Sequence, residues 1–189
     1  MNENTLYQHL ENYPIISAVK DDVGLEKCIE SESRIVFVLY GSINNISDIV
    51  SRLKKADKTV FVHADLIDGL ANREASIEFL NSAVKPDGII STKLSLIKRA
   101  KSLGMLTVMR FFVIDSRAME NIRHCDLKQY ADFIEILPGL MPKIINKVSQ
   151  LTKKPVIAGG MIDEKDDVVT ALSSGAVAIS TTNTKVWFL

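Results

Sequence analysis

Short apolar runs alternate with longer amphipathic stretches along the whole chain. The runs are rich in β-branched and aromatic residues and recur about 20 to 25 residues apart. Because they do not alternate cleanly between apolar and polar positions, we expect strands buried on both faces, as in a parallel sheet. The predicted strands span residues 14–19, 34–40, 59–65, 87–92, 106–112, 132–137, 155–160 and 176–182.

The stretches between these runs have the period of helices that pack one face against a core. In 45–56 an apolar stripe runs along one side, and Ser47 is suited to cap the helix start. The stretch 91–104 ends at Gly104, the position where glycine closes a helix. The stretch 163–175 begins acidic and ends in glycine, which matches the helix dipole. The residues expected to face inward are Ile46, Ile49, Val50 and Leu53, then Leu94, Ile97, Ala100 and Leu103, then Ile144, Ile145, Val148 and Leu151.

Eight strands that alternate with helices predict one domain over residues 1–189, a compact TIM-like (β/α)8 barrel with parallel strands. An open doubly wound sheet is the alternative, but eight evenly spaced units favour closure. The chain is shorter than the usual ~250 residues of such barrels, so its helices and loops should be short. The C-terminal "TKVWFL" leaves little room for a last helix. We expect Trp187 and Phe188 to be exposed there, where they could cover a barrel end or contact a second copy in a homodimer.

Composition narrows the class of protein. With 47% hydrophobic and 24% charged residues, the chain is ordinary for a globular protein. No apolar run approaches the ~18 residues that span a bilayer, and the N-terminal sequence lacks the features of a signal peptide. Cys28 and Cys125 have no metal-ligand spacing, so we expect free thiols in a reducing cytoplasm. His9 and His124 fall in helical stretches and are expected at the surface.

Charge is unevenly distributed although the formal net charge is zero. Residues 1–33 carry two basic and seven acidic side chains, a net charge of −5, whereas residues 93–154 carry twelve basic and five acidic ones, a net of +7. Two interpretations stay open: scatter over solvated helix faces, or a basic patch that meets an anionic partner. No RNP motif, KH loop or zinc knuckle is present, so RNA recognition would have to use a surface of basic helices.

Ligands of such barrels bind at the carboxyl ends of the strands, and the loops after strands seven and eight commonly hold a phosphate. Here these loops contain "GG" and "STTN", which offer backbone N–H groups and hydroxyls to an anion. Of the two glycines, we expect Gly159 to turn the chain and Gly160 to keep the backbone bare beside the phosphate. The alternative is a tight corner followed by an ordinary loop. The predicted phosphate site is Gly159, Gly160, Ser180, Thr181 and Thr182.

Charged side chains stand at other strand ends. Arg110 lies within an apolar strand and must reach the rim or pair with a carboxylate, for which Glu135 on the next strand is the natural partner. His63 and Asp65 are two residues apart and face the same side of a strand. That spacing suits a general base with its orienting carboxylate, or two metal ligands. Only Glu135 offers a third ligand, so we expect no metal.

Together the strand-end motifs closely resemble those of the glycerol-3-phosphate-responsive antiterminator family, the glycerol uptake operon antiterminator regulatory proteins of Gram-positive bacteria. The resemblance covers essentially the whole chain and keeps the order of the motifs. It implies a cytoplasmic (β/α)8-like regulator that binds glycerol 3-phosphate and acts on the mRNA leader of glycerol operons to prevent premature termination. No cofactor and no catalytic residues are expected. The motifs are "FVHADLIDGL", "KPDGIISTK", "RFFVIDS", "EILPG", "PVIAGG" and "STTN".

The resemblance also implies where the ligands bind. The phosphate of glycerol 3-phosphate would sit at the predicted phosphate site, and the +7 region adds a basic surface for RNA. The glycerol moiety would lie near His63, Asp65, Ser91, Lys93, Arg110 and Glu135. The RNA would contact Arg52, Lys54, Lys55, Lys98, Arg99, Lys101, Lys153 and Lys154.

The alternative is a barrel enzyme acting on a small phosphorylated substrate, of isomerase, aldolase or phosphodiesterase type, with His63 or Glu135 as base and Lys93 as electrophile.

Overall fold

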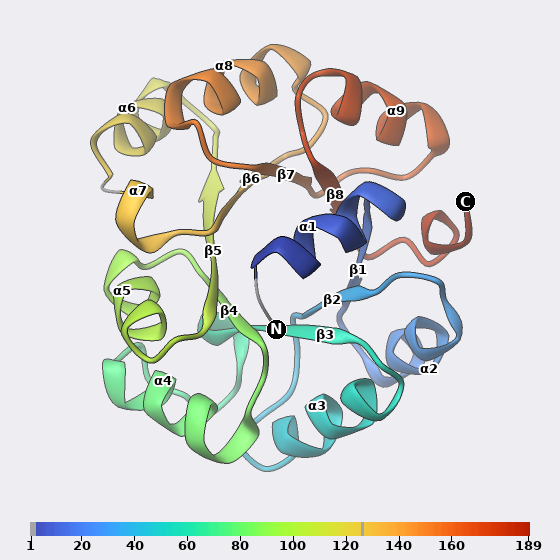
Figure 1. Cartoon of the computed structure of the whole chain (residues 1–189), viewed down its shortest axis with the longest axis vertical. Helices are drawn as coiled ribbons and strands as arrows, with labels where there is room; N and C mark the ends of the chain where they lie inside the picture. Colours follow the sequence, from blue (N-terminus) through green and yellow to red (C-terminus); the bar gives the residue numbers. More distant parts are fainter. Residues whose placement is uncertain (1–2, 126) are drawn as a thin grey trace.

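The computed structural model describes residues 3–125 and 127–189, and its parallel strands form a closed barrel in the order of the sequence (Figure 1). Strand β8 pairs with β1, with Thr181 opposite Ser17, so the sheet has no free edge. The predicted (β/α)8 barrel is confirmed and the open sheet is excluded. The strands are β1 (Ile15–Val19), β2 (Ile35–Val38), β3 (Thr59–His63), β4 (Gly88–Ser91), β5 (Leu106–Phe112), β6 (Phe133–Leu137), β7 (Val156–Gly159) and β8 (Ala178–Thr181).

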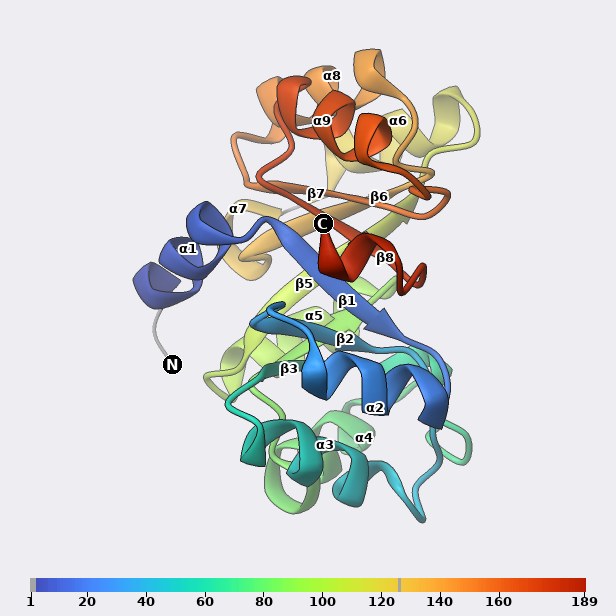
Figure 2. The ribbon, with the colours of Figure 1, turned by 90° about the vertical axis from the view of Figure 1, so that its right-hand side faces the viewer.

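Helices α2 to α9 form an outer ring around the barrel, and α1 lies across one end of it (Figures 1 and 2). The helices are α1 (Glu3–Asn12), α2 (Asp22–Glu30), α3 (Ile46–Lys55), α4 (Glu74–Phe79), α5 (Leu94–Ser102), α6 (Ser116–His124), α7 (Leu127–Tyr130), α8 (Pro142–Thr152) and α9 (Lys165–Ser173). Three shorter turns complete the chain, η1 (Ala64–Leu66), η2 (Leu80–Val84) and η3 (Val186–Phe188). The single turn η3 takes the place of a last outer helix, as the short C-terminal sequence predicted.

The helical periodicity places most side chains correctly. All four inward positions predicted for α3 are buried, and Gly104 takes a positive φ of 76° just after α5. Two details were wrong. Helix α3 begins after Asn45, so Ser47 lies inside the helix and does not cap it. Leu151 is 36% exposed because the face of α8 that packs inward carries Ile145, Val148 and Thr152 instead.

Helix α1 closes the N-terminal end of the barrel, lying across the starts of the strands (Figures 1 and 2). Leu6 and Leu10 are buried in an apolar cluster with lumen residues such as Phe37, Phe61 and Phe133. His9, expected at the surface, is half-buried on this helix, with its Nδ1 atom shielded from solvent. With this end filled by apolar side chains, the opposite end of the lumen is left for polar ones.

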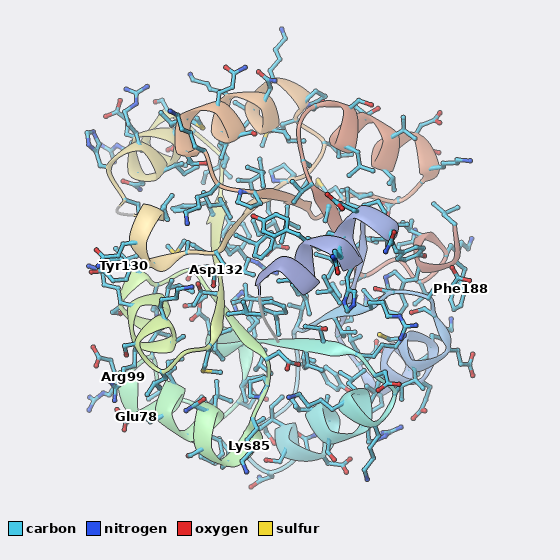
Figure 3. The ribbon with its side chains drawn as sticks, in the orientation of Figure 1. Glu78, Lys85, Arg99, Tyr130, Asp132 and Phe188 are labelled. Atoms are coloured by element: carbon cyan, nitrogen blue, oxygen red, sulfur yellow. The ribbon has the colours of Figure 1, made fainter. Side chains whose placement is uncertain are left out.

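The C-terminal segment is tied to both ends of the barrel. Trp187 Nε1 donates to the carbonyl oxygen of Thr181 at 2.8 Å, and the Tyr13 hydroxyl donates to the carbonyl oxygen of Trp187 at 2.6 Å. Trp187 is only 1% exposed, so its predicted exposure was wrong, whereas Phe188 is 55% exposed at the periphery (Figure 3). Buried tryptophan fills the place beside β1 and β8 that a longer helix would cover.

Two simpler expectations concern thiols and membrane spans. Cys28 is buried and Cys125 half-buried, and among the described residues neither forms a disulfide. Among the described residues, no helix is both long enough and apolar enough to cross a bilayer.

Candidate functional site

A buried ion pair lies in the lumen at the carboxyl end of the strands. Arg110 and Glu135 stand opposite each other on β5 and β6, and Arg110 Nε donates to Glu135 Oε2 at 2.6 Å. Ser180 Oγ on β8 donates to the other oxygen, Oε1, at 2.5 Å. The predicted pair is confirmed, and the bond from Ser180 adds a third strand to it. Each carboxylate oxygen of Glu135 therefore accepts one hydrogen bond from another strand.

The two glycines at the end of β7 have the reverse of the roles that we expected from the sequence. Gly160 takes the positive φ, 77°, and turns the chain. A Cβ atom on Gly159 would lie 2.6 Å from both Glu135 Oε1 and Ser180 Oγ, closer than such atoms can approach. Gly159 is therefore the residue that keeps the backbone bare, and the group that needs the space is the Ser180–Glu135 bond.

His63, the last residue of β3, lies near enough to the Arg110–Glu135 ion pair for the Arg110 charge to affect it. It is 2% exposed, and its Nδ1 atom is buried without a hydrogen-bond partner in the described part of the chain. Burial, and next the Arg110 charge, lower the pKa of His63 to about 4, although Asp65 acts to raise it. The imidazole is therefore neutral at pH 7, with a proton on one ring nitrogen only. Within residues 3–125 and 127–189, no three His, Cys, Asp or Glu side chains are grouped to hold a metal ion.

Asp65 does not orient His63, contrary to the expectation from their spacing. The chain turns into η1 after β3, and Asp65 instead accepts bonds from Ser91 Oγ at 2.7 Å, Thr92 N at 2.8 Å and Thr92 Oγ1 at 2.7 Å. Burial raises the pKa of Asp65, but the hydrogen bonds from Thr92 and Ser91 outweigh it and lower the pKa. Ser91 Oγ also accepts from the backbone N–H of Lys93. These residues fasten the loop after β4.

A cavity of about 110 Å³ opens at this end of the barrel. It brings together the buried ion pair and most of the predicted phosphate site, whereas Gly159 lies behind its wall. A second hollow of about 290 Å³ adjoins it and shares Ala18 and Thr182. The first cavity is lined by Ala18, Leu39, Arg110, Glu135, Leu137, Gly160, Met161, Asp163, Ser180, Thr181 and Thr182. The second adds Lys20, Asp21, Val23, Gly24, Asn183, Thr184 and Trp187.

The predicted phosphate donors differ in what they already bind. Ser180 Oγ donates to Glu135, and Thr181 Oγ1 donates to the carbonyl oxygen of Ile162 at 2.7 Å. The Gly160 N–H reaches the carbonyl oxygen of Ser180 only at 3.4 Å, a long and weak bond. An anion in the cavity would therefore meet Gly160 and Thr182 more readily than the other two hydroxyls.

Sequence reasoning missed Lys20, which lines the second hollow. Its position was a usable signal, because Lys20 directly follows β1 at the carboxyl end of that strand. Asp163 and Met161 in the cavity wall had no such signal.

The eight cations considered for RNA binding do not form one free patch. Four are held in ion pairs: Arg52 with Glu26, Lys54 with Asp87 at 3.2 Å, Arg99 with Glu78 at 2.7 Å, and Lys101 with Asp132. Figure 3 shows Arg99 beside Glu78 on the outer rim. The Lys98 ammonium lies 4.6 Å from the centre of the Tyr130 ring. Lys55, Lys153 and Lys154 remain, all near the ends of helices.

The fold and this strand-end site define a (β/α)8 barrel with a small polar cavity at the carboxyl ends of its strands. Over residues 15–187 the chain matches the family described as glycerol-3-phosphate responsive antiterminator, and it belongs to that family.

Individual relatives agree with this assignment. The Escherichia coli (strain K12) protein YgcP, which is uncharacterized, is 44% identical over 180 residues, covering 95% of this chain and 94% of that protein. The glycerol uptake operon antiterminator regulatory protein from Listeria monocytogenes is 36% identical, with a TM-score of 0.89 over 93% of this chain and 95% of that one. An antiterminator-related protein from Thermotoga maritima is 32% identical, with a TM-score of 0.81 over 92% and 96%.

Enzymes also share the architecture. Deoxyribose phosphate aldolase from Aeropyrum pernix has a TM-score of 0.70 over 98% of this chain and 96% of that one, at 13% identity. This likeness concerns the barrel fold alone.

Proposed function

We propose that the protein is a transcription antiterminator controlled by glycerol 3-phosphate, which it binds at the carboxyl end of the barrel. Membership of the glycerol-3-phosphate responsive antiterminator family supports glycerol 3-phosphate as the effector. The observation that carries the proposal is the cavity between the ends of β7 and β8, which sits above the buried Arg110–Glu135 pair. A small ligand there would contact polar groups from four strands at once.

The charges of the cavity suggest how the effector lies. Arg110 and Glu135 balance each other in charge, so the part of the cavity that they line favours the uncharged hydroxyls of the glycerol moiety. The phosphate then points to the mouth, at Gly160 and Thr182, beside Lys20 of the adjoining hollow. Asp163 also lines the mouth and opposes an anion, so the Lys20 charge is needed there.

The regulatory output in this proposal is contact with the mRNA leader of glycerol-utilisation genes in the cytoplasm. An effector shifts RNA affinity only if it binds the RNA-competent state more tightly than the other state. By the same linkage, RNA must tighten effector binding by an equal factor. A reciprocal change in the two affinities is therefore the signature of the proposed function.

A pair of variants at Gly160 tests the effector site. Asp and Asn have similar shapes and both tolerate the positive φ, so Gly160→Asn is a matched control for Gly160→Asp. In isothermal titration with glycerol 3-phosphate, we expect the Asp variant to lose at least tenfold more affinity than the Asn variant. The Asp variant should also lose the effector-induced rise in unfolding temperature. Equal affinities in the two variants would show that the phosphate lies elsewhere.

One observation favours a second candidate, a barrel enzyme acting on a small phosphorylated substrate. The Nδ1 atom of His63 is buried without a partner among the described residues, so this nitrogen could accept a proton from a substrate, although its pKa of about 4 makes it a weak base at pH 7. Turnover of phosphorylated three-carbon to five-carbon compounds by the wild type, abolished in His63→Gln, would establish that function. Effector binding without turnover in both proteins supports the regulator.

A further inference from the structure

A large hollow lies at the opposite end of the barrel from the effector cavity. Its volume is about 740 Å³, and it is bounded by α1, by the loop from α2 to β2 and by the loop from α3 to β3, around the strand starts seen in Figure 1. Nothing in the proposed effector site uses it. Its lining residues are His9, Asn12, Tyr13, Ile29, Ser31, Glu32, Arg34, Ala56 and Lys58.

Two cations, Lys58 and Arg34, line the hollow, although residues 1–33, which supply most of its other lining residues, carry a net charge of −5. Lys58 is 7% exposed and donates to the carbonyl oxygens of Ser31 at 2.6 Å and Ser33 at 2.9 Å, which holds its ammonium group in place. Burial, and next the Arg34 charge, act to lower the pKa of Lys58. Arg34 is exposed, and none of the carboxylates whose side chains the structure describes forms an ion pair with it. Glu32 is the one acidic residue among those that line the hollow.

More cations gather at this end because of the topology. In a parallel barrel the outer helices run antiparallel to the strands, so their C-terminal ends point to the strand starts. Lys55 closes α3, and Lys153 and Lys154 follow α8, as expected for cations that offset the negative ends of helix dipoles. These lysines surround the barrel end on which the hollow opens.

We propose that this N-terminal hollow is the docking site for a single-stranded segment of the target RNA. Arg34 and the surrounding lysines would contact phosphates, and Tyr13 and Asn12 in the wall would meet a base, the combination of cations and aromatic groups that single strands favour. The inference rests on the proposed function, which supplies RNA as the partner. It also explains how RNA and effector bind together, since they occupy opposite ends of one barrel.

Charge reversal tests the site. Arg34→Glu and Lys55→Glu change exposed residues at this end, whereas Lys143→Glu changes an exposed lysine in the first turn of α8, at the effector end, and serves as a charge-matched control. The RNA would be the labelled leader transcript of the glycerol-utilisation genes from the same genome. We expect Arg34→Glu to weaken binding at least tenfold and to reduce the slope of log affinity against log salt by about one. Lys143→Glu should stay within twofold of wild type.

The outcomes separate this inference from the proposed function. If wild type binds the leader in an effector-dependent manner but Arg34→Glu and Lys55→Glu bind as well as Lys143→Glu, the function stands and the hollow is the wrong surface. If wild type binds no leader RNA at any effector concentration, both the proposed function and the hollow are overturned. Titration with glycerol 3-phosphate and unfolding curves on every variant exclude misfolding as the cause of lost RNA binding.

Discussion

At the scale of single residues, Gly159 shows that a glycine can be needed to leave room for neighbouring side chains, without contacting a ligand itself. Its missing Cβ leaves the space in which Ser180 bonds to Glu135. That bond in turn holds the ion pair under the cavity. In the proposed effector site, the glycine would therefore act on the ligand through two other residues.

We predict that Gly159→Ala destabilises the protein by about 1–3 kcal/mol through overpacking and weakens effector binding at least tenfold. Gly104→Ala is the control, because Gly104 has a φ of 76° but nothing within 4 Å of its would-be Cβ. Its cost should be about 1–2 kcal/mol of backbone strain, with no change in effector affinity. Urea unfolding and calorimetric titration measure both effects. An unchanged effector affinity in Gly159→Ala would contradict the argument.

His63 should impose a pH dependence on stability. Its folded pKa of about 4 lies below the unfolded value of about 6.5, so the unfolded chain binds more protons between these values. The stability due to His63 is complete above pH 6.5 and falls on acidification by up to about 1.4 kcal/mol per pH unit. Urea unfolding between pH 7 and 5 should show this loss in wild type and in the exposed control His124→Gln. A similar slope in His63→Gln would refute the assignment.

At the scale of elements, the segment after β8 covers the part of the barrel that a last outer helix would otherwise cover. Turn η3 places the indole of Trp187 against the end of β8, where its Nε1 donates a hydrogen bond to the carbonyl oxygen of Thr181. The same side chain lines the hollow beside Lys20 and Thr182. A ligand at the mouth of the effector cavity thus lies close to this indole.

Since Trp187 is the one tryptophan of the sequence, its fluorescence should report on the effector site. We expect glycerol 3-phosphate to change the intensity or wavelength of tryptophan emission with the same dissociation constant that calorimetry gives. Gly160→Asp should show the change only at much higher concentrations. Saturated binding by calorimetry with an unaltered spectrum would place the effector away from β8.

At the scale of the whole molecule, a short hydrogen-bonded route joins the two ends of the barrel. Tyr13 lines the N-terminal hollow, and its hydroxyl donates to the carbonyl oxygen of Trp187. The indole Nε1 of Trp187 donates in turn to the carbonyl oxygen of Thr181, beside the effector cavity. A change at one end can bias the other only if this route has two arrangements of different stability.

Tyr13→Phe removes one bond of the route and keeps the ring. We expect the variant to bind glycerol 3-phosphate alone and RNA alone within about threefold of wild type. The factor by which each ligand tightens the other should fall toward one, by equal amounts because linkage is reciprocal. Measuring RNA affinity with and without effector gives this factor. Full coupling in Tyr13→Phe would show that the two ends communicate by another path.

Most of the barrel was predictable from local pattern. Apolar runs buried on both faces gave every strand, and the helix stripes gave the inward residues of α3. The pairing of Arg110 with Glu135 followed from the cost of burying either charge alone. What the pattern did not reveal was contact between distant segments, such as the plugging of the lumen by Leu6 and Leu10.

The sequence by itself determined the strand order, the barrel and the strand ends on which the cavity forms, because hydrophobic periodicity and short connections leave few other topologies. Only the tertiary structure decided which glycine turns the chain, that Asp65 binds Ser91 and Thr92 and not His63, and that Trp187 is buried. These outcomes depend on which side chains meet across strands that are far apart in the chain. No local spacing encodes such distances, so three-dimensional packing has to supply them.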